Sequence, residues 1–118
     1  MSKKTIKSFG SYEKTTQHHM IRPSLNRRLA RLLYVYTCLS EEVGEIGGVL
    51  KRIARDNGGK VTREVRAALG KECGDVFWTL TRLVKKLGFS MTEIASDNAK
   101  KINDRVKRGK IKGSGDDR

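Results

Sequence analysis

Residues 29–53 have the sequence LARLLYVYTCLSEEVGEIGGVLKRI, and this stretch decides the fold class. Large apolar residues recur in it at alternating steps of three and four, the spacing of a helix face that packs against another helix. This apolar stripe consists of Leu29, Leu32, Tyr36, Leu39, Val43, Ile46, Leu50 and Ile53. We therefore expect a long amphipathic helix with at least one helical neighbour.

Capping and helix-breaking residues define the expected ends of this helix. Ser24 can cap a helix that begins just past Pro23, and the cluster DNGG at residues 56–59 stops it. A short helix is expected over about 9–20, after a basic, frayed start at residues 1–8.

Two further helices are expected in the C-terminal half. Thr62 can cap the first, which runs to about Leu87 and is closed by Gly88 in a left-handed conformation. Residues 90–93, SMTE, form a capping box that opens the last helix, which ends near Gly109. The apolar faces of these two helices comprise Val65, Leu69, Val76, Leu80, Leu83 and Leu87, and then Ile94, Ala95, Ile102 and Val106.

These elements predict an all-α chain of about four helices, packed as a bundle around two long central helices. No segment shows the sustained alternation of a β-strand. A length of 118 residues suffices for one core, so we expect a single domain over 1–118 that ends in a glycine-rich loop at 109–118.

Composition restricts the partners of the chain. The net charge of +13 attracts polyanions such as nucleotides, nucleic acids or anionic membranes, without choosing among them. No apolar run is long enough for a signal peptide or a membrane span, so we expect a cytoplasmic protein without a membrane partner. Cys38 and Cys73 fall within expected helices and lack the spacing of a zinc site, which predicts buried free thiols.

Two pairs of acids lie beside the apolar helix faces. Glu42 and Glu45 lie three residues apart on the long helix, and Glu72 and Asp75 repeat this spacing on the next. One such pair alone is typical of a solvated face, but two pairs beside core positions would meet if the helices pack antiparallel. Gathered carboxylates stay ionised together only when cations neutralise them, and oxygen ligands suit Mg²⁺ or Mn²⁺. A hard cation in a basic protein indicates a phosphate-bearing substrate.

Two other groups of residues are unusual for helices. Gly44, Gly47 and Gly48 weaken the long helix, which indicates that another backbone, helix or ligand approaches closely there. On the last helix an amide and three cations share one face and could bind triphosphate oxygens, although a plain solvated basic face is an equal alternative. These residues are Asn98, Lys101, Arg105 and Arg108.

Three runs of the sequence carry a family resemblance: LSEEVGEIGGVLKRI at 39–53, LGKECGDVFWTLTRLVKKLG at 69–88, and DNAKKINDRVKRGKIKGSGDDR at 97–118. An EExxE segment at 41–45 is followed on the next helix by an ExxD segment at 72–75. In this order and helical context the chain resembles the MazG family of all-α nucleoside triphosphate pyrophosphohydrolases, over roughly residues 33–118.

The resemblance implies a Mg²⁺-dependent enzyme, also active with Mn²⁺, that splits a nucleoside triphosphate into a monophosphate and pyrophosphate. The residues at the family's metal-ligand positions are Glu42, Glu45, Glu72 and Asp75. Glu41 would orient or deprotonate the attacking water, and Asn98 and Lys101 would contact the substrate with support from Arg105. Family members form dimers or tetramers with sites near subunit contacts, so the resemblance also implies a homo-oligomer that does not require nucleic acid.

The N-terminal third resembles the family less and leaves the substrate base open. Tyr12 could stack on a base and Glu13 could accept hydrogen bonds from a guanine edge, although an ordinary surface helix is the favoured alternative for both. A purine deoxynucleotide such as dGTP is the expected substrate on this basis. The adjacent rings of His18 and His19 would diverge on a helix and are expected at the surface, and Trp78 is expected in the core near the site.

Two other function classes remain open on the sequence. A small basic helical DNA-binding protein would fit the charge and the helices, but its acids would repel phosphate unless a metal intervened. A non-catalytic helical interaction protein would fit the fold, but it would not need the complete set of acids.

Overall fold

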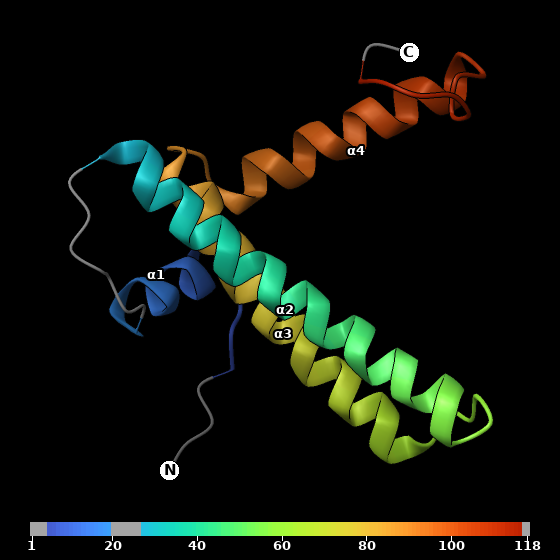
Figure 1. Cartoon of the computed structure of the whole chain (residues 1–118). Coiled ribbons are helices and arrows are strands. Elements are labelled where there is room, and N and C mark those ends of the chain that lie inside the picture. The colour runs from blue at the N-terminus through green and yellow to red at the C-terminus, as the bar shows by residue number, and fades with distance from the viewer. Residues whose placement is uncertain (1–4, 20–26, 117–118) are drawn as a thin grey trace.

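The computed structural model describes residues 5–19 and 27–116, which form four α-helices (Figure 1). They are α1 (Phe9–His19), α2 (Arg28–Asp56), α3 (Arg63–Lys86) and α4 (Met91–Lys107). Because these residues contain no β-strand, the all-α prediction with four helices is confirmed. No helix in the described ranges is both long enough and apolar enough to cross a membrane.

The expected capping and breaking residues set most of the helix ends. Beyond the end of α2, Gly58 and Gly59 adopt positive φ angles of 59° and 74°, which glycine tolerates. The Thr62 hydroxyl accepts a hydrogen bond from the Val65 amide at 3.2 Å and so caps α3. At the start of α4 the Ser90 hydroxyl and the Glu93 carboxylate bond to each other's backbone amides, so the predicted capping box is confirmed.

The start of the long helix differs from the prediction. Helix α2 begins at Arg28, and Arg27 before it is extended at φ −101° and ψ 135° and offers no side-chain cap. The predicted cap Ser24 lies outside the described residues, so that cap stays a prediction. The cysteines are free as predicted, and Cys38 is half-buried, but the prediction that Cys73 is buried was wrong, because its side of α3 is exposed.

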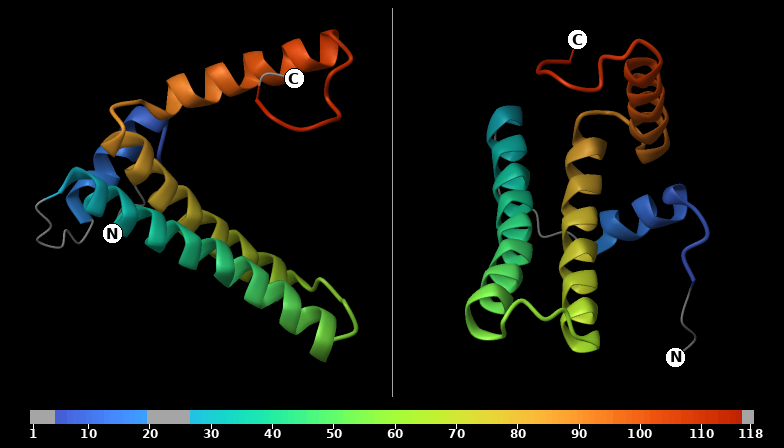
Figure 2. Two further views of the ribbon diagram at one scale, coloured as in Figure 1. Left: turned by 45° about the horizontal axis from the view of Figure 1, so that its top comes forward. Right: turned by 90° about the vertical axis from the view of Figure 1, so that its right-hand side faces the viewer.

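The helices form an antiparallel hairpin with two appendages rather than a closed bundle. Helices α2 and α3 run side by side along their lengths, and α1 packs against α3 (Figure 1). Helix α4 contacts α1 and α3 but not α2, and it extends away from the hairpin (Figure 2). The predicted bundle of four helices is therefore wrong for α4, because among the described helices only α1 and α3 contact it and none packs along its length.

The apolar stripe of α2 is divided between two environments. One row, repeating every seven residues, is exposed: Leu29, Tyr36, Val43 and Leu50. The alternate row is covered: Leu32, Leu39, Ile46 and Ile53. A further row at Val35, Glu42 and Val49 is covered as well, so the observed seam is rotated relative to the expected stripe. On α3 the predicted core residue Leu87 is exposed, since it follows the last helical residue.

The buried apolar core of the described residues is small. It consists of Val35, Ile53, Val84 and Met91. The radius of gyration is 17.5 Å, whereas a compact chain of this length would have about 13–14 Å. The chain therefore leaves large apolar surfaces on α2 and α4 uncovered.

Candidate metal centre

Two carboxylates interrupt the seam between α2 and α3. Glu42 follows Val35 and Leu39 along the covered face of α2, and Glu72 follows Leu69 in the same way on α3. Apolar residues would stabilise the hairpin at both positions, whereas an ionised acid loses hydration there. The two acids therefore require a function other than packing, or a cation that neutralises them.

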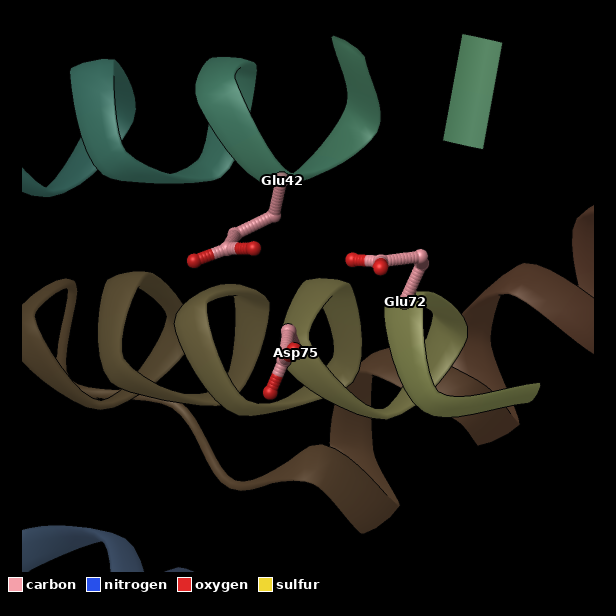
Figure 3. A group of neighbouring side chains, drawn as sticks. All are labelled: Glu42, Glu72 and Asp75. Atoms are coloured by element: carbon pink, nitrogen blue, oxygen red, sulfur yellow. The ribbon is translucent and has the colours of Figure 1, made fainter. Parts of the chain in front are cut away.

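Glu42, Glu72 and Asp75 form a group of neighbouring carboxylates. One oxygen from each of the three lies within 4.8 Å of the others. Glu42 and Glu72 both extend into the space between the facing helices α2 and α3, and Asp75 lies on α3 close to them (Figure 3). The i,i+3 spacing places Glu72 and Asp75 on one face of α3, and the antiparallel packing brings Glu42 opposite to them.

The electrostatics of this group are unfavourable without a counterion. Partial burial raises the pKa of the Glu42 carboxyl above its ordinary value, and the charges of Asp75, Glu41, Glu72 and Glu45 raise it further, in that order. Each cause disfavours ionisation of Glu42. In a chain with a net charge of +13, this negative site is a local exception.

The donor chemistry of the group fits a hard divalent cation. Carboxylate oxygens are the ligands that Mg²⁺ and Mn²⁺ prefer, and two or three of them with water complete such a site. A bound cation would also offset the repulsion that raises the pKa of Glu42.

The two remaining acids of the EExxE segment lie at the edge of the group. Glu41 and Glu45 are exposed, and Glu45 is not part of the close group of three. Both are near enough for their charges to raise the pKa of Glu42. The structure thus gathers three of the four predicted ligands and places Glu45 beside them.

The predicted substrate-binding residues lie elsewhere in this chain. Asn98 and Lys101 are exposed on α4, which makes no contact with α2. Arg105 is only 4% exposed, so it is not an open cationic surface. Within the described residues, the acids and the α4 cations therefore do not form one continuous site.

Helix α1 lies beside the acid group, which the sequence did not reveal. The Tyr12 ring packs on Phe77 at a centroid distance of 4.9 Å and meets the half-buried Trp78 edge-on at 6.1 Å. Burial raises the pKa of Tyr12, and the charge of Asp75 adds to the shift. Tyr12 is thus near Asp75, and with Phe9 and Phe77 it lines an open hollow of about 520 Å³.

Glu13 has a different position from the one predicted. It is 9% exposed, and its Oε1 accepts a hydrogen bond of 2.7 Å from the Met91 amide at the start of α4. Its Oε2 lies 3.7 Å from Lys85 Nζ. The predicted surface position was wrong, because Glu13 joins α1 to α3 and α4, and each of its carboxylate oxygens faces a partner within the chain. The side chains of His18 and His19 lie outside the described set.

The glycines of α2 do not meet a close neighbour in this chain. A Cβ atom at Gly44 or Gly47 would have nothing within 4 Å, and at Gly48 it would meet the flexible end of Arg52 at 3.3 Å. The predicted close approach is therefore absent within the described residues, which leaves this part of α2 open.

Comparison with known proteins identifies the family. A family model described as the MazG nucleotide pyrophosphohydrolase domain matches residues 32–109, more than half of the chain. The curated "Gene 37 protein" of Mycobacterium phage L5 is 40% identical over 87 residues, which cover 74% of this chain and 76% of the phage protein. No solved structure gives a significant match.

The fold and the acid group define an all-α protein with a candidate divalent-metal centre between two antiparallel helices. With the family match over α2, α3 and α4, the chain belongs to the MazG nucleotide pyrophosphohydrolase family. The match does not extend over α1 or over the tail that follows residue 109.

Proposed function

We propose that this protein hydrolyses a nucleoside triphosphate to the monophosphate and pyrophosphate in the presence of Mg²⁺ or Mn²⁺. The observation that carries the proposal is the placement of Glu42 and Glu72 in the helical seam, with Asp75 close to both. Family membership supports the same reaction. The repulsion between these three acids destabilises the hairpin when no cation is bound. A catalytic cation held by the three acids explains why they lie together.

The residues divide into those that hold the cation and those that act on water. Glu42, Glu72 and Asp75 would hold it directly, and Glu45 would complete the set from the edge of the group. When bound, the cation would neutralise charge on phosphate oxygens and act as a Lewis acid. Glu41, exposed next to Glu42, would orient the attacking water and accept its proton.

We propose that the active unit is a homodimer or a tetramer built from dimers. The exposed apolar row of α2 provides a surface that a second copy would cover. Because α4 extends away from the acids of its own chain, a second copy would also bring α4 cations close to them. Asn98 and Lys101 would then contact the phosphates, with Arg105 in support.

The hollow that Tyr12 lines supports a position for the base, because the charge of Asp75 acts on Tyr12. Phe9, Tyr12 and Phe77 offer aromatic surface, and a purine would bury more of that surface than a pyrimidine. We therefore retain a purine deoxynucleotide as the proposed substrate. The specific argument for guanine no longer holds, because Glu13 is bonded to the Met91 amide.

Pyrophosphate release from a panel of nucleoside triphosphates, with and without Mg²⁺, tests the function. Glu42→Gln and Asp75→Asn should each lower kcat by about 100-fold or more while circular dichroism stays unchanged. Glu64→Gln removes an exposed acid from the first turn of α3 and should retain activity. Full activity of either site variant would contradict the assignment, and an inactive wild type would favour the non-catalytic interaction protein.

A further inference from the structure

The C-terminal tail, residues 109–116, folds back against α4. Gly109 has a positive φ of 65°, which reverses the chain, and the Lys110 amide then donates a hydrogen bond of 2.7 Å to the Arg105 carbonyl. The tail passes beside the distal part of α4 (Figure 2). Positive φ angles at Gly113 and Gly115 bend it further. The glycines of the tail thus make a compact return that other residues would strain.

The return places one carboxylate against the two α4 cations. Asp116 Oδ1 lies 3.1 Å from Lys101 Nζ and 3.0 Å from Arg105 Nη2. Arg105 Nη2 also donates to the Asp116 carbonyl at 2.7 Å and to the Gly115 carbonyl at 3.4 Å. Hydrogen bonds from Lys101 and Arg105 lower the pKa of Asp116, so its carboxylate is ionised at neutral pH.

The bonding leaves Arg105 enclosed and Asp116 near the solvent. The Arg105 side chain is 5% exposed and its Nε has no hydrogen-bond partner among the described residues, whereas the Asp116 side chain is 79% exposed. An anion that approaches Arg105 must therefore meet the tail first, whereas the Lys101 side chain is 41% exposed and is reached directly. Carboxylate and phosphate oxygens accept the same kind of hydrogen bond, so a phosphate group that took the Arg105 Nη2 donors would have to displace Asp116 and the tail carbonyls from them. The Lys101 ammonium has three donors, and Asp116 accepts from it at 3.1 Å.

We propose that Asp116 is an intramolecular competitor of the substrate. Its carboxylate occupies the phosphate-binding donors of Lys101 and Arg105 until a polyphosphate displaces the tail. This inference rests on the proposed function, since it takes Lys101 and Arg105 as phosphate-binding residues. The tail is suited to such displacement because the ion pair of Asp116 with Lys101 is solvent-exposed and therefore weak, and the Asp116 side chain itself is 79% exposed. A triphosphate carries several negative charges and can contact both cations with more than one oxygen.

Steady-state kinetics of Asp116→Asn test the competition. The variant should lower KM by about two- to fivefold with kcat unchanged, which corresponds to the usual contribution of an exposed ion pair. Asp56→Asn is the matched control, because it also removes one exposed Asp and its ion pair, with Arg55, but at the far end of α2. Both variants raise the net charge equally, so a general attraction of the substrate would lower both KM values.

A KM for Asp116→Asn that equals the control or exceeds the wild-type value would overturn the proposal. A KM above the wild-type value would show that the tail positions Lys101 and Arg105 for substrate binding and does not compete with the substrate.

A binding measurement without turnover separates this inference from the proposed function. Inorganic tripolyphosphate with Mg²⁺ should shift the backbone amide signals of Gly113 and Gly115 toward those of a free peptide in the NMR spectrum of the whole protein. Asp116→Asn should show part of that shift without the ligand. If tripolyphosphate binds but these signals do not move, the tail is no competitor, whether or not the protein hydrolyses nucleotides. If the signals move but no nucleotide is hydrolysed, only the proposed reaction fails.

Discussion

Replacement of Glu42 by glutamine should stabilise the metal-free protein while it destroys the metal centre. In the folded protein the pKa of Glu42 is raised above its ordinary value of 4.5. Folding therefore favours the protonated carboxyl, and this contribution is fully present below the ordinary pKa. It is lost as the pH rises through the raised pKa, so at neutral pH the ionised Glu42 opposes folding. Glutamine keeps the shape of the side chain and removes the charge.

The spacing of the three carboxylates gives the expected size of this effect. At the upper separation of 4.8 Å, two unit charges repel by about 0.9 kcal/mol in water and by about 3.5 kcal/mol at an effective dielectric constant of 20. Asp75 is exposed, so solvent screening favours the lower figure. Glu42 takes part in two of the three pairs, and the substitution should stabilise the metal-free protein by about 2 kcal/mol. The corresponding rise in Tm is about 4–10 °C.

Thermal unfolding at pH 7 with EDTA, and again with millimolar Mg²⁺, provides the assay. The wild type should gain stability from Mg²⁺, whereas Glu42→Gln should start higher and gain little. Glu64→Gln is the control: its acid lies at the start of α3, where a negative charge favours the helix, so its loss should lower Tm slightly. A Glu42→Gln protein that is less stable than the wild type without metal, or that keeps the full response to Mg²⁺, would refute the reasoning.

Three further predictions concern other parts of the molecule. Lys101→Ala should lower kcat/KM by about 5- to 150-fold through loss of a charged hydrogen bond, whereas Lys107→Ala on the same helix should not; equal effects would remove the specific role of Lys101. Tyr36→Glu places a charge in the exposed apolar row of α2 and should dissociate the oligomer, as measured by sedimentation. A wild-type protein that is active as a monomer would exclude the subunit model. Glu13→Ala should lower the free energy of unfolding by about 1–3 kcal/mol, because the buried Met91 amide loses its acceptor. Glu13→Gln should lower the free energy of unfolding by less. Equal unfolding midpoints for both variants would contradict the role of that hydrogen bond.

Most of the features that the sequence predicted correctly are local ones. The caps at Thr62 and Ser90 and the breaker after Asp56 depend on residues within one turn, and their chemistry is visible in the sequence. The meeting of Glu42 with Glu72 and Asp75 required only helical periodicity and antiparallel neighbours.

The features that were missed depend on contacts between distant segments. Two rows of α2 are equally apolar, so periodicity could not decide that Leu32 would be covered and Tyr36 exposed. Glu13 bonds to an amide 78 residues away, and its sequence neighbours give no sign of that partner. Asp116 lies in a glycine-rich tail whose return path depends on backbone angles that many glycine sequences can adopt.

Identification of the products by phosphorus NMR tests the central claim most directly. With Mg²⁺ and a purine deoxynucleoside triphosphate, the protein should form the monophosphate and pyrophosphate in equal amounts, and EDTA or Asp75→Asn should stop the reaction. Release of inorganic phosphate with a nucleoside diphosphate, or the absence of any hydrolysis across all common nucleoside triphosphates, would contradict it.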